Sequence, residues 1–144
     1  SLEGRIPLVI DGGPTQRGIE STIVAATGGP LRLLRRGPIE VEAVEAEGAV
    51  EAPGMLASHY APAKPLRLDA REALAGEFLI GFGAVVGHAS LSERGEPVEA
   101  AARLFDLLHQ ADEAPQPRIA VAPIPGDGLA AAIRDRLKRA AAPR

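Results

Sequence analysis

EPVEAAARLFDLLHQADEAPQPRIAVAPIP (residues 96–125) is the stretch that decides the fold class. Its first part repeats apolar residues at steps of three and four, which predicts a helix over 96–114 with one apolar face. Its last part, 118–125, is an apolar run closed by prolines, which predicts a buried strand. The predicted apolar face of the helix consists of Val98, Ala101, Ala102, Phe105 and Leu108.

Elements of the same two kinds flank this stretch. Strands are predicted at 65–69 and 77–83, the second with an optional continuation through 84–89, and one or two helical turns at 70–76. A second helix is expected to begin at Asp127, its predicted cap, and to close the chain. In this helix we expect a buried stripe of Leu129, Ile133 and Leu137 and an i,i+4 ion pair between Asp135 and Arg139.

Strands that alternate with helices indicate an α/β fold. We expect a small Rossmann-like C-terminal domain over 66–144, in which helices pack on a mainly parallel sheet. The N-terminal third has a different pattern. Strands are predicted there at 5–10, 19–25 and 31–37, followed at 38–53 by a short amphipathic helix and a connector.

Composition narrows the class of protein. The 144 residues are 46% hydrophobic but only 3% aromatic, which predicts an aliphatic, alanine-rich core. The net charge of −3 gives no general attraction to nucleic acid or membranes, and no apolar run approaches the roughly 20 residues of a membrane span. The absence of cysteine fits a reducing compartment, so we expect a cytoplasmic protein. The start at Ser1 predicts the tail of a longer chain, with an expression-tag scar as the alternative.

Glycines follow the strand predicted at 77–83. Gly81, Gly83 and Gly87 suggest a dinucleotide-binding turn, which requires a helix that opens at the glycines and presents its N-terminus to a pyrophosphate. The β-branched sequence after them disfavours such a helix. We therefore favour glycines that permit a tight turn and close packing.

The histidines and the basic end of the last helix carry weaker signals. His59, His88 and His109 are not at metal-ligand spacing, so no metal site is predicted. The basic helix end either contacts tRNA phosphates or forms a solvated face that complements the helix dipole, and we favour the solvated face. Its members are Arg134, Arg136, Lys138 and Arg139.

Two hydroxyls and two arginines mark the strands of the N-terminal third. Ser21 and Thr22 follow a glycine-rich loop, at a strand start of the kind that faces ligands in α/β enzymes. Arg35 and Arg36 end the next predicted strand, and by alternation only one of them faces a given side. An arginine beside strand-borne hydroxyls has the planar donor fork that holds a phosphate.

Four stretches occur in order: DGGPTQRGIESTIV (11–24), LRLLRRG (31–37), APGMLASHYAP (52–62) and IPGDGLAAAIRDRLKRAA (124–141). In this combination the chain resembles the L-threonylcarbamoyladenylate synthases of the long, two-domain form. The resemblance implies three parts. Residues 1–45 are a remnant of a YrdC-like catalytic domain, 46–65 are a linker and active-site flap, and 66–144 are the Rossmann-like C-terminal domain.

The family condenses L-threonine, bicarbonate or CO2, and ATP, with Mg2+ on the nucleotide, into threonylcarbamoyl-adenylate and pyrophosphate. A partner transferase then moves the threonylcarbamoyl group onto tRNA. The resemblance implies that Ser21 contacts threonine and that Arg35 and Tyr60 contact ATP. Met55 and His59 share the linker motif with Tyr60 and are assigned no contact. No catalytic residue or metal ligand is assigned to this chain, and direct tRNA binding stays open.

Two positions depart from the family pattern, because Ala25 replaces the usual aspartate and Arg36 replaces the proline of the LRPG motif. The family's earlier Lys-x-Arg and Ser-x-Asn motifs do not occur in these 144 residues. We therefore expect the isolated chain to be inactive, and residues 46–65 to be mobile without the rest of their pocket. The alternative is a non-catalytic regulatory or docking module that acts on a separate catalytic chain.

Overall fold

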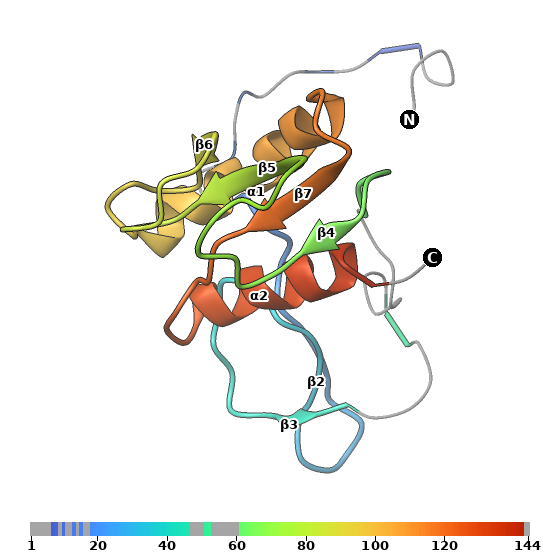
Figure 1. Ribbon diagram of the computed structural model, residues 1–144. Helices are drawn as coiled ribbons and strands as arrows, with labels where there is room; N and C mark the ends of the chain where they lie inside the picture. Colours follow the sequence, from blue (N-terminus) through green and yellow to red (C-terminus); the bar gives the residue numbers. More distant parts are fainter. Residues whose placement is uncertain are drawn as a thin grey trace.

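The computed structural model describes residues 7–8, 10, 13, 15, 18–46, 51–52 and 61–142. The larger unit is a sheet with two helices (Figure 1). The sheet consists of β4 (Leu66–Arg67), β5 (Glu77–Gly81), β6 (Ala89–Ser90) and β7 (Arg118–Val121), and the helices are α1 (Pro97–Glu113) and α2 (Leu129–Ala140). The strand order is β4-β7-β5-β6 and every neighbouring pair is parallel, so the predicted α/β fold is confirmed.

Both helices pack against the same face of this sheet. Alternate residues of β5 and β7, among them Ile80, form one hydrophobic cluster with Leu104 of α1 and Ile133 of α2. The intervening strand residues point to the other face, where Leu79 packs with the buried Ala70. The large unit is therefore two-layered, with a loop rather than a helix over its second face.

β5 and β6 are parallel although only a short turn joins them, and parallel strands usually need a longer crossover. Glycines permit the turn. A Cβ on Gly81 would lie 2.3 Å from the carbonyl oxygen of Val85, and one on Gly87 would lie 2.4 Å from that of Leu79. No helix opens at these described glycines, so the tight-turn interpretation is confirmed. The optional continuation of the strand through 84–89 is wrong, because the chain folds back beside β5.

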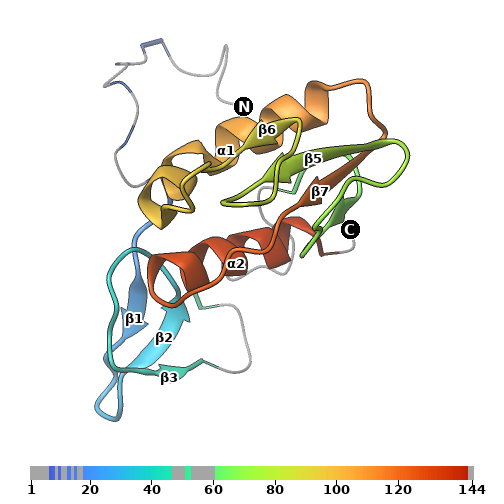
Figure 2. The same ribbon diagram turned by 60° about the vertical axis from the view of Figure 1, so that its left-hand side comes forward.

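A second, smaller sheet consists of β1 (Ile23–Ala25), β2 (Arg32–Arg35) and β3 (Val44–Glu45) and lies beside α2 (Figure 2). β1 is antiparallel to β2, whereas β3 is parallel to β2. Ile19, just before this sheet, packs into the hydrophobic cluster of the large unit. The two sheets therefore share a packed interface.

Three predicted elements are wrong within the described residues. Residues 38–46 form no helix, because their acidic–apolar alternation has the two-residue period of a strand and leads into β3. Residues 70–76 form turns, because the side chains of Arg67 and Glu77 bond to the backbone of that loop in place of helical partners. In the predicted strand at 5–10, the described Pro7, Leu8 and Ile10 belong to no strand.

The helix predicted at 96–114 is confirmed as α1, with errors on its buried face. Ala101 and Leu108 are buried as expected, and Phe105 is half-buried. Val98 and Ala102 are exposed instead, because the buried face of the helix is shifted to the adjacent strip of apolar residues that contains Leu104 and Leu107. The buried residues are Ala100, Ala101, Leu104, Leu107, Leu108 and Ala111.

The last predicted helix is confirmed as α2, but Asp127 does not cap it. The N-cap position is occupied by Gly128 at φ 58°, one residue later, and no side chain caps the helix. The i,i+4 pair of Asp135 with Arg139 is confirmed at 3.1 Å. Of the expected stripe, Ile133 and Leu137 are buried and Leu129 is half-buried. Neither helix of the described chain is long and apolar enough to cross a membrane.

Candidate functional site

The structure brings Ser21 and Arg35 together at one end of the small sheet. Nε of Arg35 donates to the Ser21 carbonyl oxygen at 3.0 Å, and Nη2 of Arg35 donates to Ser21 Oγ at 3.2 Å. Ser21 is exposed and Arg35 is partly exposed. A hydroxyl that accepts a hydrogen bond keeps its own O–H to donate. The Ser21–Arg35 pair therefore presents a cation and a hydroxyl donor at one place.

The neighbouring candidates have other partners. Arg36 forms an ion pair with Glu45 of β3 and does not join Arg35 on the serine, as strand alternation predicts. Thr22 Oγ1 donates to the carbonyl oxygen of Ile39 at 2.6 Å and accepts from the Ile39 amide at 3.2 Å. Thr22 therefore fixes a loop, and Ser21 is the hydroxyl that meets the arginine.

A buried ion pair beside this site was not predicted from the sequence. Arg136 of α2 is only 5% exposed, and its Nε donates to Glu20 Oε2 at 2.6 Å. Burial alone raises the pKa of Glu20, but the hydrogen bonds from Arg136 and from its own amide, with the charges of Arg136 and Arg35, hold that pKa below its usual value. The predicted solvated face is wrong for Arg136, because this side chain shares a helical stripe with the buried Ala132 and Ala140.

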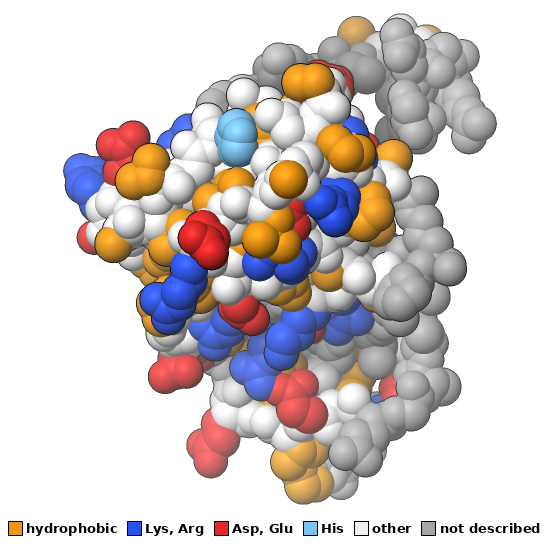
Figure 3. Space-filling model, in the orientation of Figure 1, with side chains coloured by type: hydrophobic (Ala, Val, Ile, Leu, Met, Phe, Trp, Pro, Cys, Tyr) orange, Lys and Arg blue, Asp and Glu red, His pale blue; other side chains and the backbone are white. Residues whose placement is uncertain are grey.

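The other three side chains at the basic end of the last helix differ in their surroundings, because some form bonds within the protein and others face solvent. Figure 3 shows Lys and Arg side chains across the middle of one face, where Figure 1 places α2. Arg134 donates to the carbonyl oxygens of Ile124 and Gly126 at 2.7 and 2.6 Å. Arg139 is partly buried beside its aspartate partner, whereas Lys138 is exposed. Only part of the group is therefore a solvated face.

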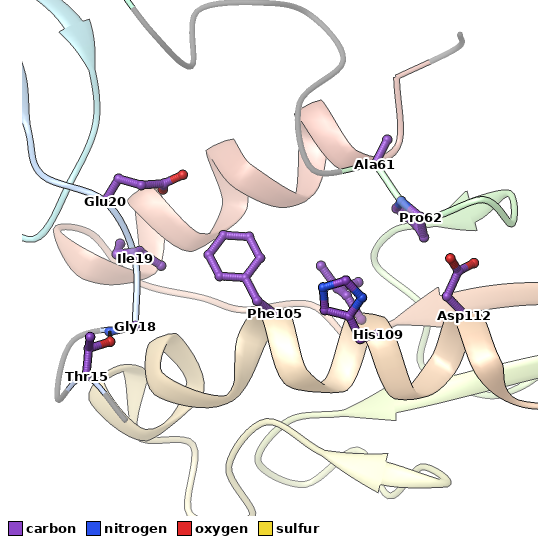
Figure 4. Close-up of a pocket in the computed structure, with 10 residues that line it drawn as sticks. Thr15, Gly18, Ile19, Glu20, Ala61, Pro62, Phe105, His109 and Asp112 are labelled. Carbon is purple, nitrogen blue, oxygen red and sulfur yellow. Dashed lines mark hydrogen bonds between the residues drawn. The ribbon is translucent and has the colours of Figure 1, made fainter. Parts of the chain in front are cut away.

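A cavity of about 530 Å³ lies between α1, the segment before β1 and the end of the linker, and its lining includes Glu20, the neighbour of Ser21 in the sequence. Figure 4 shows Phe105 and His109 projecting from α1 into the space that Ile19 and Glu20 border. Asp112 lies at its far end, where the chain re-enters the large unit. This volume lies in the range of small-molecule sites. The walls of the cavity are mostly apolar and carry a few polar groups, as in such sites.

The end of the predicted linker is anchored on α1. The Asp112 carboxylate accepts from the amides of Ala63 and Lys64 at 2.9 and 3.0 Å. In return, Lys64 Nζ donates to the carbonyl oxygens of Ala111 and Ala114 at 2.9 and 2.5 Å. The lysine also places a cation at the helix C-terminus, where the helix dipole favours it. This reciprocal contact fixes where the linker joins the large unit.

The central residues of the linker motif, 53–60, lie outside the described residues. Met55, His59 and Tyr60 belong to 53–60, and 47–50 are also not described. The predicted ATP contact of Tyr60 and the expected mobility of 46–65 therefore stay predictions.

The described histidines have no arrangement suited to a metal. His88 Nδ1 accepts from the Leu79 amide at 3.0 Å, and its ring stacks on Phe78 with centroids 5.0 Å apart, which makes it a structural residue. His109 is exposed on α1. Within the described part of the chain, no group of three or more His, Cys, Asp or Glu side chains is placed to hold a metal ion.

These features define a class of α/β protein. A two-layer parallel domain holds, through α2, a second sheet that carries an arginine–serine pair. The family described as "Threonylcarbamoyl-AMP synthase, C-terminal domain" matches residues 15–142. The chain belongs to this family.

Relatives agree with the family in both sequence and structure. Threonylcarbamoyl-AMP synthase of Bacillus subtilis (strain 168) is 32% identical, with 97% of this chain and 50% of the relative covered. The protein of the same name from Pyrococcus abyssi (strain GE5 / Orsay) is 29% identical over 95% of this chain and 50% of the relative. The crystal structure of P. abyssi Sua5 complexed with L-threonine superposes with a TM-score of 0.83 at 26% identity, covering 97% of this chain and 51% of that chain. This chain thus spans about half the length of these relatives.

Proposed function

We propose that this chain is the C-terminal part of an L-threonylcarbamoyladenylate synthase, a nucleotidyltransferase that makes threonylcarbamoyl-AMP and pyrophosphate from L-threonine, bicarbonate or CO2, and ATP. The observation that carries the proposal is the Ser21–Arg35 pair, in a chain of the synthase's own family. The relatives that bear this name are about twice as long. One of them, Sua5 of P. abyssi, was solved with L-threonine, which supports threonine as the amino acid substrate.

The proposed reaction needs orientation and charge rather than a nucleophile from the protein. The threonine amine combines with CO2, or with bicarbonate and loss of water, to give a carbamate. A carbamate oxygen then attacks the α-phosphorus of ATP, and pyrophosphate leaves. Because two anionic reactants must meet, the useful protein groups are cations and hydrogen-bond donors held in place beforehand.

Ser21 and Arg35 are groups of that kind. The guanidinium that donates to Ser21 Oγ polarises the hydroxyl, which strengthens the bond that its own O–H gives to an oxygen of the threonine substrate. Arg35 also brings a permanent positive charge to the phosphates of ATP. In the proposal, Tyr60 of the linker provides a further contact to the nucleotide.

Mg2+ enters the proposal with ATP, as part of the substrate. The described residues offer no cluster of ligands for the ion, so no residue of this chain is assigned to it. The ion would neutralise charge on the phosphates when it is bound. The product then passes, in the cytoplasm, to the transferase that modifies tRNA.

Threonine-dependent release of pyrophosphate from ATP by the complete synthase tests the role of Ser21. Ser21→Ala should raise the KM for threonine by roughly 10- to 100-fold, the cost of one hydrogen bond to a charged group, and leave the KM for ATP nearly unchanged. Ser90→Ala is the matched control, because the buried Oγ of Ser90 has no hydrogen-bond partner within the described structure. A KM for threonine equal to that of the wild type would contradict the assignment.

Arg35 is tested in the same assay by Arg35→Lys, which keeps the charge and removes the planar fork. The KM for ATP should rise, whereas Arg32→Lys on the same strand, which affects an ion pair with Glu51, should leave it unchanged.

The 144-residue chain alone should release no pyrophosphate, since it is half of the proposed enzyme. Turnover by the chain alone would contradict this division of the enzyme.

A further inference from the structure

Arg136 reaches from α2 to the small sheet. Its side chain is 4% exposed, and each part of the guanidinium has an acceptor. Nε donates to Glu20 Oε2 at 2.6 Å, and Nη2 donates to the backbone carbonyl oxygen of Arg36 at 2.9 Å. Nη1 donates to Asp135 Oδ2 at 2.8 Å, which orients the guanidinium from its own helix.

The two acceptors outside α2 flank the Ser21–Arg35 pair. Glu20 directly precedes Ser21, and Arg36 directly follows Arg35. The guanidinium of Arg35 in turn donates to both the carbonyl and the hydroxyl oxygen of Ser21. One side chain of the large unit thus binds the chain on both sides of the pair, across 116 and 100 residues of sequence.

The backbone around the pair leaves little room for independent movement. A Cβ on Gly37 would lie 2.2 Å from the Thr22 nitrogen and 2.5 Å from the Ser21 carbonyl carbon. The two segments therefore pass each other in close contact, and a shift of one displaces the other. A contact that fixes Glu20 and Arg36 consequently fixes the position of the Ser21 hydroxyl.

Stability alone is a poor reason for this arrangement. Burial of a guanidinium is costly, and apolar side chains of similar volume often replace buried ion pairs without loss of stability. An apolar side chain cannot supply direction, whereas the planar guanidinium ties each donor to one acceptor. The fork is therefore suited to holding two segments of the small sheet in a defined position.

We propose that Arg136 is a positioning residue for threonylcarbamoyl-AMP synthesis: from the C-terminal domain it holds the segments that carry Ser21 and Arg35 in register for threonine and ATP. The inference rests on the function proposed above. It assigns the C-terminal domain a part in building the active site. Arg136 acts through Glu20 and the Arg36 carbonyl, without contact to a substrate.

The experiment compares Arg136→Met and Arg136→Lys in the complete synthase with Arg134→Met. Arg134 is a matched control, because it lies on the same helix and donates to carbonyl oxygens within its own domain. Arg136→Met should lower kcat/KM for threonine by roughly 10- to 100-fold, as expected when a residue that orients a binding group is lost. Arg136→Lys should restore part of this loss, and Arg134→Met should stay near wild type.

Amide hydrogen exchange of the same variants provides a readout independent of turnover. Arg136→Met should accelerate exchange at 19–23 and 35–37, and Arg134→Met should not. Glu20→Gln added to Arg136→Met should cause little further loss, because both changes break the same contact.

Several outcomes would overturn the inference. Equal losses of kcat/KM in Arg136→Met and Arg134→Met, or unchanged exchange at 19–23 in Arg136→Met, would each do so. An inactive wild-type synthase would instead refute the proposed function. The exchange comparison would still decide whether Arg136 holds these segments.

Discussion

The two sheets differ in what covers them. The four-stranded sheet is packed by two helices around fully buried residues such as Ile119 and Ile133. Among the described residues 18–46, the buried hydrophobic side chains are Leu33 and Leu34, while Ile39 and Val44 are largely exposed. The large sheet therefore has its own core, whereas the small sheet draws order from contacts with its surroundings.

Those contacts come mainly from the two helices. A Cβ on Gly18 would lie 2.0 Å from the carbonyl oxygen of Ala101, so the segment before β1 passes directly over α1. Ile19 and the Glu20–Arg136 pair complete the interface. The difference teaches that the residues of the proposed site are positioned by the domain beside them more than by their own sheet.

The largest expected effect is on the free energy of unfolding, and its test compares one strand residue from each sheet. Ile119→Ala in β7 removes a fully buried side chain and should lower the free energy of unfolding by about 2–5 kcal/mol. Val44→Ala in β3 should change it by less than about 0.5 kcal/mol, because Val44 is 53% exposed. Urea denaturation measures both. Similar losses would show that the small sheet has a core of its own.

A glycine substitution probes how tightly the small sheet is packed at the site. Gly37→Ala forces a Cβ to within 2.2 Å of the Thr22 backbone and should cost about 1–3 kcal/mol of local stability. Gly29→Ala is the control, since a Cβ there meets nothing within 4 Å. Amide exchange at β1 measures the effect. Equal protection in the two variants would contradict the close contact.

The third prediction concerns pH and the large sheet. Arg67 donates to both oxygens of the buried Glu77, at 2.9 and 2.7 Å. These bonds, with the Leu74 amide and the charges of Arg67 and Arg118, lower the pKa of Glu77 from 4.5 to about 2 despite burial. The folded pKa lies below the unfolded one, so the stabilisation is present above pH 4.5 and disappears as pH falls toward 2.

Glu77→Gln should therefore make the urea midpoint less dependent on pH in this window, with lower stability than wild type at neutral pH. Glu93→Gln is a control, because Glu93 is exposed. A steep loss of stability at acid pH that persists in Glu77→Gln would show that other carboxyl groups dominate the pH dependence of stability.

The smallest effect is expected for the ion pair on the small sheet. Arg32 binds both oxygens of Glu51 at 2.8 Å, and the two side chains are 33% and 39% exposed. Solvent screens such a pair, so Glu51→Gln should leave the urea midpoint nearly unchanged, and added salt should remove any residual difference. A fall in the urea midpoint as large as that caused by Glu77→Gln would show that the ion pairs of the two sheets contribute equally to stability.

Much of the fold could be predicted from local pattern. The spacing of Ala101, Phe105 and Leu108 predicts the helical period of α1, and the apolar run at 118–125 predicts β7, because burial in these elements agrees with local propensity. Residues 70–76 could not be assigned in this way. Side-chain bonds from Arg67 and Glu77, which come from the strands before and after this loop, replace helical bonds there.

The site was predictable only in part. The resemblance implied roles for Ser21 and Arg35, and the structure adds their direct contact. Arg136 was grouped with its basic neighbours on the solvated face. The signal that reveals it is helical position, since Ala132, Arg136 and Ala140 recur at four-residue steps on one buried stripe. Its partner Glu20 could not be found from the sequence, because the contact spans 116 residues.

The reach of Arg136 also bears on how far this protein can be recombined. In the proposed division of the synthase, a chimera with its breakpoint in the linker at 46–65 would separate Glu20 and Arg36 from the helix that binds them. Such chimeras should work only where the donor helix carries arginine at this position and the recipient carries a carboxylate before its serine. A breakpoint within the linker would therefore not make the two proposed domains freely interchangeable.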